Sequence, residues 1–262
     1  MLKKIIISLI TIIFCYQFFI NDSPKLDQEI SLQDKSLYNG DLILINKDSK
    51  LQQDPTNLTT IPQNLAENVL VDSEYKVQQN LIEPLKQMFE AAQEDGIQHF
   101  KFNSAYRSGK LQQQLYEQKG AEYALPSGSS EHQTGLSIDI GSTQGTMDKT
   151  KEGKWLEEHA TDFGFILRYP ENKVDITGIA FEPWHFRYVG LPHSVMMKQK
   201  DMSLEEYIKY LKDEKDYTTK VDGVKYFVQY VENTNQAKIP DTAKFVVSGD
   251  NLDGFIITSV IK

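Results

Sequence analysis

The sequence predicts an α+β protein with a small β-rich region at its C-terminal end. Apolar residues recur at three- and four-residue spacing in one long segment, which is typical of an amphipathic helix, and alternate with polar residues in several short segments, which is typical of strands. The 262 residues, 40% hydrophobic and 25% charged, suffice for one enzyme-sized core and a small appendage. The net charge of -9 leaves no basic surface for phosphate backbones, so we expect no nucleic-acid partner.

Residues 1–24 are expected to be a signal peptide or an N-terminal membrane anchor. Lys3 and Lys4 precede an uncharged apolar run over residues 5–20, the pattern of an export signal. No Ala-x-Ala cleavage site follows, so cleavage and anchoring both stay open. The only cysteine, Cys15, lies in this run, and the exported part therefore lacks an intramolecular disulfide. The remainder of the chain is predicted to lie outside the cytoplasm.

The first part of the exported chain is predicted to hold a tether, a strand and a helix. Residues 25–38 are polar and without a clear period, which favours a tether. Residues 42–45 (Leu-Ile-Leu-Ile) are expected to form a buried strand. From 74 to 94 the apolar residues follow helical spacing, which Gly96 ends, and Pro84 is expected to kink the helix.

Strands and a capped helix are expected in the middle of the chain. Residues 97–104 alternate and lead into Tyr-Arg-Ser at 106–108, where Ser108 can cap a helix. Further strands are expected over 136–140, 165–169 and 179–188, and a further helix over 155–163.

The chain after residue 200 is expected to form a separate C-terminal subdomain. Ser203-Leu-Glu-Glu206 is a capping box that opens a short helix, and alternation predicts strands over 224–231, 245–247 and 255–257. We therefore assign 39–200 to the main domain and 201–262 to the C-terminal subdomain.

Two short segments carry residues that suit a zinc site. His132 and Asp139 lie seven positions apart, and Gly135 between them allows a tight turn. A catalytic zinc ion uses three protein ligands and leaves a fourth position for water. The segment Glu182-Pro-Trp-His185 supplies a further imidazole and a carboxylate that can take a proton from that water, whose pKa a metal lowers from about 15.7 towards 7. Either segment alone is a weak signal.

Three ordered motifs resemble one family. The stretch 130–139 (Ser-Glu-His-Gln-Thr-Gly-Leu-Ser-Ile-Asp) is similar to the Ser-x-His-x-x-Gly-x-x-x-Asp signature of the VanY-type D-alanyl-D-alanine carboxypeptidases, relatives of the VanX dipeptidases. The segments 182–185 and 106–108 match their Glu-x-x-His and Tyr-Arg-Ser. The resemblance runs from about Leu42 to His193, and Ser137 stands where the family often has Ala.

The resemblance implies the roles of the site residues. His132, Asp139 and His185 would hold one zinc ion, and Glu182 would be the general base. Arg107 would neutralise charge that develops on the scissile carbonyl oxygen, a role that suits a cation in a partly dry cleft.

The resemblance also implies substrate contacts and a fold. Ser130 corresponds to the substrate-contacting serine of the family. A glutamine on the helix after Arg107 would also contact substrate; the run from Gln112 to Gln114 leaves three candidates, of which we take Gln113. The implied fold is the Hedgehog/DD-peptidase type, a mostly antiparallel sheet with helices on one side.

The expected reaction is removal of the terminal D-amino acid from peptidoglycan stem peptides, by a protein at the bacterial cell wall that contacts the membrane through its N-terminal segment. An LD-carboxypeptidase that acts on tetrapeptide stems would need the same residues. A non-catalytic wall-binding or sensor module is the alternative from another class, although such a module has no need of a base like Glu182 beside an open metal position.

Overall fold

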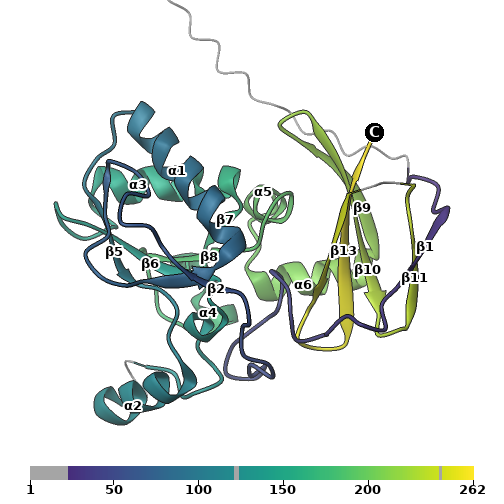
Figure 1. The fold of residues 1–262 in the computed structure, drawn as a ribbon, viewed down its shortest axis with the longest axis horizontal. Helices are drawn as coiled ribbons and strands as arrows, with labels where there is room; N and C mark the ends of the chain where they lie inside the picture. The colour runs from purple at the N-terminus through teal and green to yellow at the C-terminus, as the bar shows by residue number, and fades with distance from the viewer. Residues whose placement is uncertain (1–22, 121–123, 242–243) are drawn as a thin grey trace, which may run out of the picture.

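Two separate sheets organise the chain, as the computed structural model shows for residues 23–120, 124–241 and 244–262 (Figure 1). The first sheet and its helices form one lobe, the C-terminal sheet forms the other, and the α6 helix (Leu204–Glu214) lies between them. Residues 1–22 of the expected export segment lie outside this range. Within the part of the chain that the structure describes, no helix combines the length and apolar character needed to cross a membrane.

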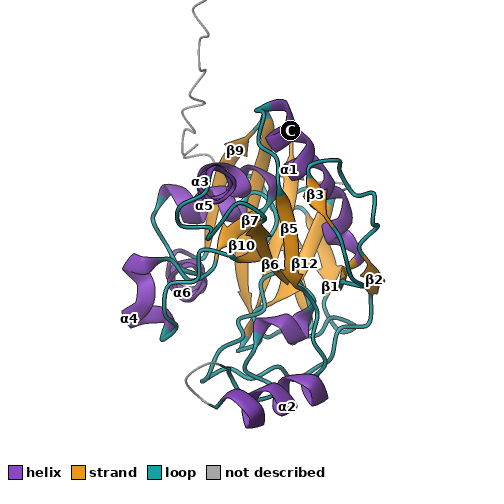
Figure 2. Cartoon of the chain, turned by 90° about the vertical axis from the view of Figure 1, so that its left-hand side faces the viewer, coloured by secondary structure: helices purple, strands orange, loops and turns teal. Residues whose placement is uncertain are grey.

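The first sheet has five strands, and three of its four pairings are antiparallel. In spatial order the strands are β3 (Val69–Leu70), β5 (Phe100–Ser104), β6 (Ser137–Ser142), β8 (His185–Tyr188) and β7 (Phe165–Leu167). Figure 2 shows this sheet with helices packed beside it. A small two-stranded sheet pairs β2 (Leu58–Thr60) with β4 (Lys76–Gln78).

One face of the five-stranded sheet forms the main hydrophobic core. Because neighbouring residues of a strand point to opposite faces, Phe100 and Phe102 of β5 and Ile138 and Ile140 of β6 share the core with Phe186 of β8. The intervening residues of β6 and β8 therefore point to the opposite face, where polar side chains can gather.

Helices complete the first lobe and connect it to the second. They are α1 (Ile82–Glu94), α2 (Gly109–Lys119), α3 (Lys151–His159), α4 (Val174–Thr177), α5 (His193–Gln199) and α6 (Leu204–Glu214), with short 3-10 helices η1 (Gln79–Leu81), η2 (Glu131–Thr134), η3 (Ala160–Phe163) and η4 (Glu171–Lys173). The apolar faces of α1 and α3 pack in the main core.

The helix expected over 74–94 begins later, at Ile82. Residues 76–78 form β4 instead, so Val77 is buried in a strand rather than in a helix. Pro84 consequently lies in the first helical turn, where its missing N–H removes no helical hydrogen bond, rather than at a kink in mid-helix.

The segment 42–45 is buried as expected, but it is not a strand. Side chains and the backbone carbonyl of Asp250, which accepts from the Leu44 N–H, satisfy its backbone groups in place of a neighbouring strand. Arg187 Nη2 donates to the carbonyls of Asp41 and Ile43, and Asn251 Nδ2 donates to the carbonyl of Leu44. An apolar run predicts burial, and cannot reveal which partner takes its backbone hydrogen bonds.

The C-terminal sheet has four antiparallel strands. In spatial order they are β12 (Phe245–Gly249), β13 (Gly254–Ile261), β10 (Val224–Glu232) and β9 (Asp216–Val221). The expected capping box is present: Ser203 Oγ accepts from the Glu206 N–H, and the Glu206 side chain accepts from the Ser203 N–H. Sequence analysis did not predict β9, whose consecutive buried residues include two threonines and do not alternate with exposed ones.

Part of the expected tether is a strand. Residues Gln28–Ser31 form β1, which pairs with β11 (Gln236–Ile239), a second strand that was not predicted. Ile30 and Leu32 pack against Ile239 and Phe255 in a third apolar cluster, so burial orders a segment whose composition is polar.

A second hydrophobic cluster joins the two lobes. It contains Leu42 and Ile166 from the first lobe, Leu211 of α6, and Val228 and Ile256 of the C-terminal sheet. The two lobes therefore share a core, and the domain boundary near residue 200 stays a prediction.

Candidate metal centre

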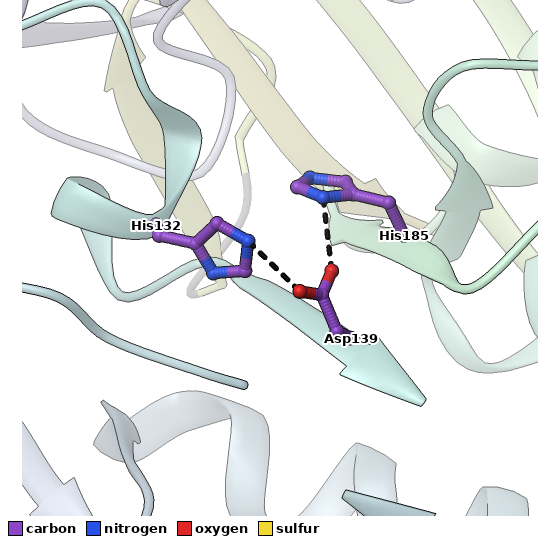
Figure 3. Close-up of side chains that lie close together, drawn as sticks. All are labelled: His132, Asp139 and His185. Atoms are coloured by element: carbon purple, nitrogen blue, oxygen red, sulfur yellow. Dashed lines mark ion pairs between the residues drawn. The ribbon is translucent and has the colours of Figure 1, made fainter. Parts of the chain in front are cut away.

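Ser104, Asp139 and His185 lie side by side in three adjacent strands, on the polar face of the first sheet. Asp139 of β6 lies opposite Ser104 of β5 on one side and opposite His185 of β8 on the other. Asp139 Oδ1 is 3.1 Å from His185 Nδ1. Figure 3 shows the Asp139 carboxylate between His185 and the side chain of His132.

A register shift in β5 brings Ser104 into this row. Phe102 pairs with Ile140 and faces the core, whereas Ser104 pairs with Asp139, so residue 103 is an extra residue on the β5 side. Such bulges re-aim side chains next to functional sites. Ser104 Oγ here accepts a hydrogen bond from Arg107 Nη2 at 2.9 Å.

His132 enters the site from η2, before β6. Gly135 ends η2 with φ +69°, and a Cβ at this position would lie 2.6 Å from Leu58 Cδ2 and 3.3 Å from the Gln78 backbone nitrogen, so the turn favours glycine. His132 Nδ1 lies 2.8 Å from the Ala105 carbonyl, to which an N–H there can donate. This arrangement leaves His132 Nε2 free to face Asp139 Oδ2, 3.3 Å away.

These three residues fit a metal ion such as zinc. One ligand atom from each of His132, Asp139 and His185 lies within 4.8 Å of the others. Asp139 Oδ1, which faces His185 Nδ1, is buried without a hydrogen-bond partner among the described residues. Two imidazoles and a carboxylate are a donor set that zinc prefers, and three protein ligands leave a position open.

The electrostatics of the cluster favour a cation. Burial raises the pKa of Asp139, but His132 and His185 outweigh it and hold that pKa well below its usual range. Burial opposes protonation of His185, yet the adjacent carboxylates of Asp139 and Glu131 raise its pKa to about 9. Without a metal the site therefore retains a proton, which a metal ion would displace on binding.

Glu182 lies beside the cluster, at its more open side. Its Oε2 is 3.5 Å from His185 Nδ1, and its side chain is 30% exposed. Burial raises the pKa of Glu182, with Asp139 and Glu131 adding to the rise and His185 opposing it. A carboxylate with a raised pKa is suited to accept and return a proton.

Arg107 follows β5 and is half-buried near Asp139. Burial lowers the pKa of Arg107, and the charge of Asp139 opposes this shift. Arg107 Nη1 donates to Gln112 Oε1 at 2.7 Å, so this residue of α2 and Ser104 together fix the guanidinium group.

Ser130 and Gln113, the two residues expected to contact substrate, lie in different elements. Ser130 is buried and immediately precedes η2, on the chain that carries His132. Gln112, not Gln113, contacts Arg107; Gln113 Nε2 donates to Glu117 and its Oε1 accepts from the Ser127 N–H. Three consecutive glutamines gave no signal of which one would face inwards, since only the rotation of α2 decides it.

Sequence analysis missed a buried charge cluster behind His185. Glu131 accepts hydrogen bonds from Arg168 and Arg187, and all three are almost fully buried. A signal was available: Arg168 and Arg187 each stand between apolar or aromatic residues at the end of a predicted strand, where an inward-facing charge needs a partner.

Comparison with known proteins identifies relatives of this chain. Residues 74–191 match the VanY family, described as D-alanyl-D-alanine carboxypeptidase. A D-alanyl-D-alanine carboxypeptidase of Enterococcus faecium is 43% identical over 238 residues, which cover 88% of this chain and 78% of the relative.

Solved structures resemble the described fold. The vancomycin-resistance D,D-dipeptidase VanXYg, solved in complex with a D-Ala-D-Ala phosphinate analog, has a TM-score of 0.78 and 29% identity, and the match covers 89% of this chain and 99% of that one. A VanY D,D-pentapeptidase variant from the VanB-type resistance cassette, solved with Zn(II), has a TM-score of 0.51 and 31% identity over 64% of this chain and 98% of its own.

Proposed function

Because this chain belongs to the VanY family of D-alanyl-D-alanine carboxypeptidases, we propose that His132, Asp139 and His185 hold one zinc ion at its active site. The chain is a zinc-dependent enzyme that hydrolyses the terminal D-alanine from peptidoglycan stem peptides. The observation that carries the residue assignment is the convergence of the three ligand atoms within 4.8 Å, with a fourth carboxylate beside them.

Zinc bound by these residues would supply a Lewis acid that lowers the pKa of water and polarises the scissile carbonyl. Glu182 would take the proton from the attacking water and return it to the leaving amine, a function for which its raised pKa is suited. Arg107 would hold the developing oxyanion, because Gln112 and Ser104 fix its guanidinium group before substrate arrives.

Ser130 and Gln113 are proposed to contact the substrate. Ser130 precedes His132 by two residues, which favours contact with a peptide bound at the metal. Gln113 lies on α2 next to the Gln112 that fixes Arg107, and its side chain also reaches the loop at Ser127.

We further propose a Hedgehog/DD-peptidase-type fold with a C-terminal subdomain over 201–262. The antiparallel pairings of β5, β6, β8 and β7 support the first assignment, and the separate four-stranded sheet supports the second.

The proposed location is outside the cytoplasm, at the bacterial cell wall. Residues 1–24, with two lysines before an apolar run, would act as a signal peptide or as the anchor that contacts the membrane. A peptidoglycan substrate supports this location, because the mature wall presents stem peptides there.

The test uses purified protein with defined pentapeptide stems ending in D-Ala-D-Ala and with the corresponding tetrapeptide stems. Release of D-alanine from the pentapeptide is the expected result. Loss of the last residue from the tetrapeptide alone would instead identify an LD-carboxypeptidase, and absence of hydrolysis on every stem would favour a wall-binding or sensor module.

The matched variant is Glu182→Ala, assayed for both metal and turnover. We expect stoichiometric zinc to be retained, since Glu182 is not among the three ligands, and hydrolysis to be lost. Unchanged hydrolysis would remove Glu182 from its proposed role.

A further inference from the structure

Glu131 is a fully buried carboxylate directly behind a proposed zinc ligand. Its Oε2 lies 3.5 Å from His185 Nε2 and accepts a hydrogen bond from Ser137 Oγ at 3.0 Å. Its Oε1 accepts from Arg168 Nε at 2.8 Å and from Arg187 Nη1 at 2.6 Å. The two oxygens therefore face different partners, and Oε2 faces the imidazole.

The two nitrogens of the His185 ring have different surroundings. Nδ1 faces Asp139 Oδ1 at 3.1 Å and Glu182 Oε2 at 3.5 Å, on the side where the metal ligands converge. Nε2 points the opposite way, is buried, and has Glu131 Oε2 as its nearby carboxylate oxygen. Since a neutral imidazole carries its proton on one nitrogen only, the partner of Nε2 decides whether Nδ1 has a free lone pair.

The surroundings of Glu131 keep it charged and fixed in place. Burial alone would raise its pKa, but Arg168 and Arg187 hold the pKa well below the usual range. Arg168 is itself held by Glu205 of α6 at 2.7 and 2.9 Å, and Arg187 by the carbonyls of Asp41 and Ile43. Helix α6 and the segment 41–43 therefore fix the two arginines that hold the Glu131 carboxylate.

We propose that Glu131 is a positioning residue that accepts a hydrogen bond from His185 Nε2–H and so directs Nδ1 to the zinc ion. A histidine that binds metal usually donates its other N–H to a carboxylate or carbonyl, which fixes the tautomer and strengthens the ligand. His132 has the mirror arrangement, since its Nδ1 faces the Ala105 carbonyl and its Nε2 faces Asp139. The inference rests on the zinc site proposed above.

The decisive measurement is the tautomer of His185 in the zinc-loaded parent protein. Long-range proton-nitrogen NMR spectra should show His185 with a slowly exchanging proton on Nε2 and with zinc on Nδ1, and His132 with the opposite assignment. Zinc on His185 Nε2, or an Nε2 without a proton, would overturn the role of Glu131 and leave the three ligands intact. A parent protein that binds no zinc would overturn the site itself.

The matched variants are Glu131→Gln and Glu152→Gln. Glu152 is a similarly buried carboxylate that accepts from Ser142 at the far end of β6. We expect Glu131→Gln to weaken zinc binding roughly 10- to 100-fold in a chelator competition at pH 7 and to change the visible spectrum of the cobalt-substituted protein. Glu152→Gln should change neither quantity.

A folded Glu131→Gln protein with parental zinc affinity and cobalt spectrum would contradict the proposal. If the loss of charge between two buried arginines prevents folding, the NMR measurement on the parent protein still decides the question.

Discussion

Asp139 and His185 are cross-strand partners in the β6–β8 pairing, and Asp139 Oδ1 lies 3.1 Å from His185 Nδ1. Because two rigid strands fix this separation, little rearrangement is needed for both side chains to bind one ion. Asp139 also approaches His132, so its two oxygens connect the ligands.

Replacement of Asp139 by Asn should therefore abolish tight zinc binding while the fold survives. The substitution keeps the shape of the side chain, and residue 139 is not part of a hydrophobic cluster. The expected loss of zinc affinity exceeds the roughly 10- to 100-fold effect typical of an outer hydrogen-bonding partner. Chelator competition measures it, and parental affinity in the variant would exclude Asp139 as a ligand.

Arg107→Lys should reduce kcat by roughly 10²- to 10³-fold and leave the zinc content unchanged, because the loss of one oxyanion donor costs about this much. The ammonium group of lysine cannot reproduce the planar guanidinium group, whose two terminal nitrogens donate to Gln112 and Ser104. Ser104→Ala is the matched control. It keeps the hydrogen bond from Arg107 to Gln112, so its kcat should fall less than that of Arg107→Lys. Steady-state kinetics with a pentapeptide stem measure both, and equal kcat values in parent and Arg107→Lys would contradict the assignment.

The neighbouring glutamines should respond differently to alanine substitution. Gln112→Ala removes a buried acceptor from Arg107 and a donor to the Leu125 carbonyl, so it should cost about 1–3 kcal/mol of stability and lower kcat. Gln113→Ala removes hydrogen bonds to Glu117 and to the Ser127 N–H, so it should cost about 0.5–1 kcal/mol of stability and raise KM. Denaturant unfolding and kinetics separate the two effects. An unchanged KM would remove Gln113 from substrate binding.

Asn251, in the turn between β12 and β13, connects the C-terminal sheet to residues 44–50. Its Nδ2 donates to the carbonyls of Leu44 and Lys50, and its φ of 63° is left-handed. Asn251→Ala should cost about 2–4 kcal/mol, because it removes two hydrogen bonds and because alanine tolerates a left-handed φ less well than asparagine. Asn251→Gly should cost about 1 kcal/mol less, because glycine adopts this φ freely. Equal unfolding free energies for both variants would contradict the backbone contribution.

His193 should make the metal-free protein less stable as the pH falls from about 6.5 towards 3. Burial lowers the pKa of His193 to about 3, between the hydroxyls of Tyr207 and Thr258. Its ordinary value is 6.5, so below that pH the unfolded chain binds a proton that the folded chain does not. The unfolding free energy should therefore fall by up to about 1.4 kcal/mol per pH unit in this window.

His193→Gln provides the comparison, because glutamine does not titrate. Its unfolding free energy, measured by denaturant between pH 6.5 and 4.5, should have a shallower slope than that of the parent. His185 adds no slope there, since its folded pKa of about 9 affects stability only above pH 6.5. Parallel slopes for the two proteins would exclude His193 as the cause.

Sequence patterns predicted those elements well whose formation depends on residues close together in the chain. The capping box at Ser203 and the alternation over 224–231 depend on residues close in sequence, and both elements are present. The strand expected at 42–45 was wrong, because side chains of Arg187 and Asn251, each more than a hundred residues away, take its backbone groups.

The sequence by itself determined the class of fold, the family motifs and the residue types that could hold a metal, because spacing and chemistry are properties of short segments. Only the tertiary structure decided which nitrogen of His185 faces the site, that Gln112 supports Arg107, and that Glu131 lies between two arginines. Each of these depends on strand register and helix rotation. Contacts between segments distant in sequence determine both, so no local pattern can predict them.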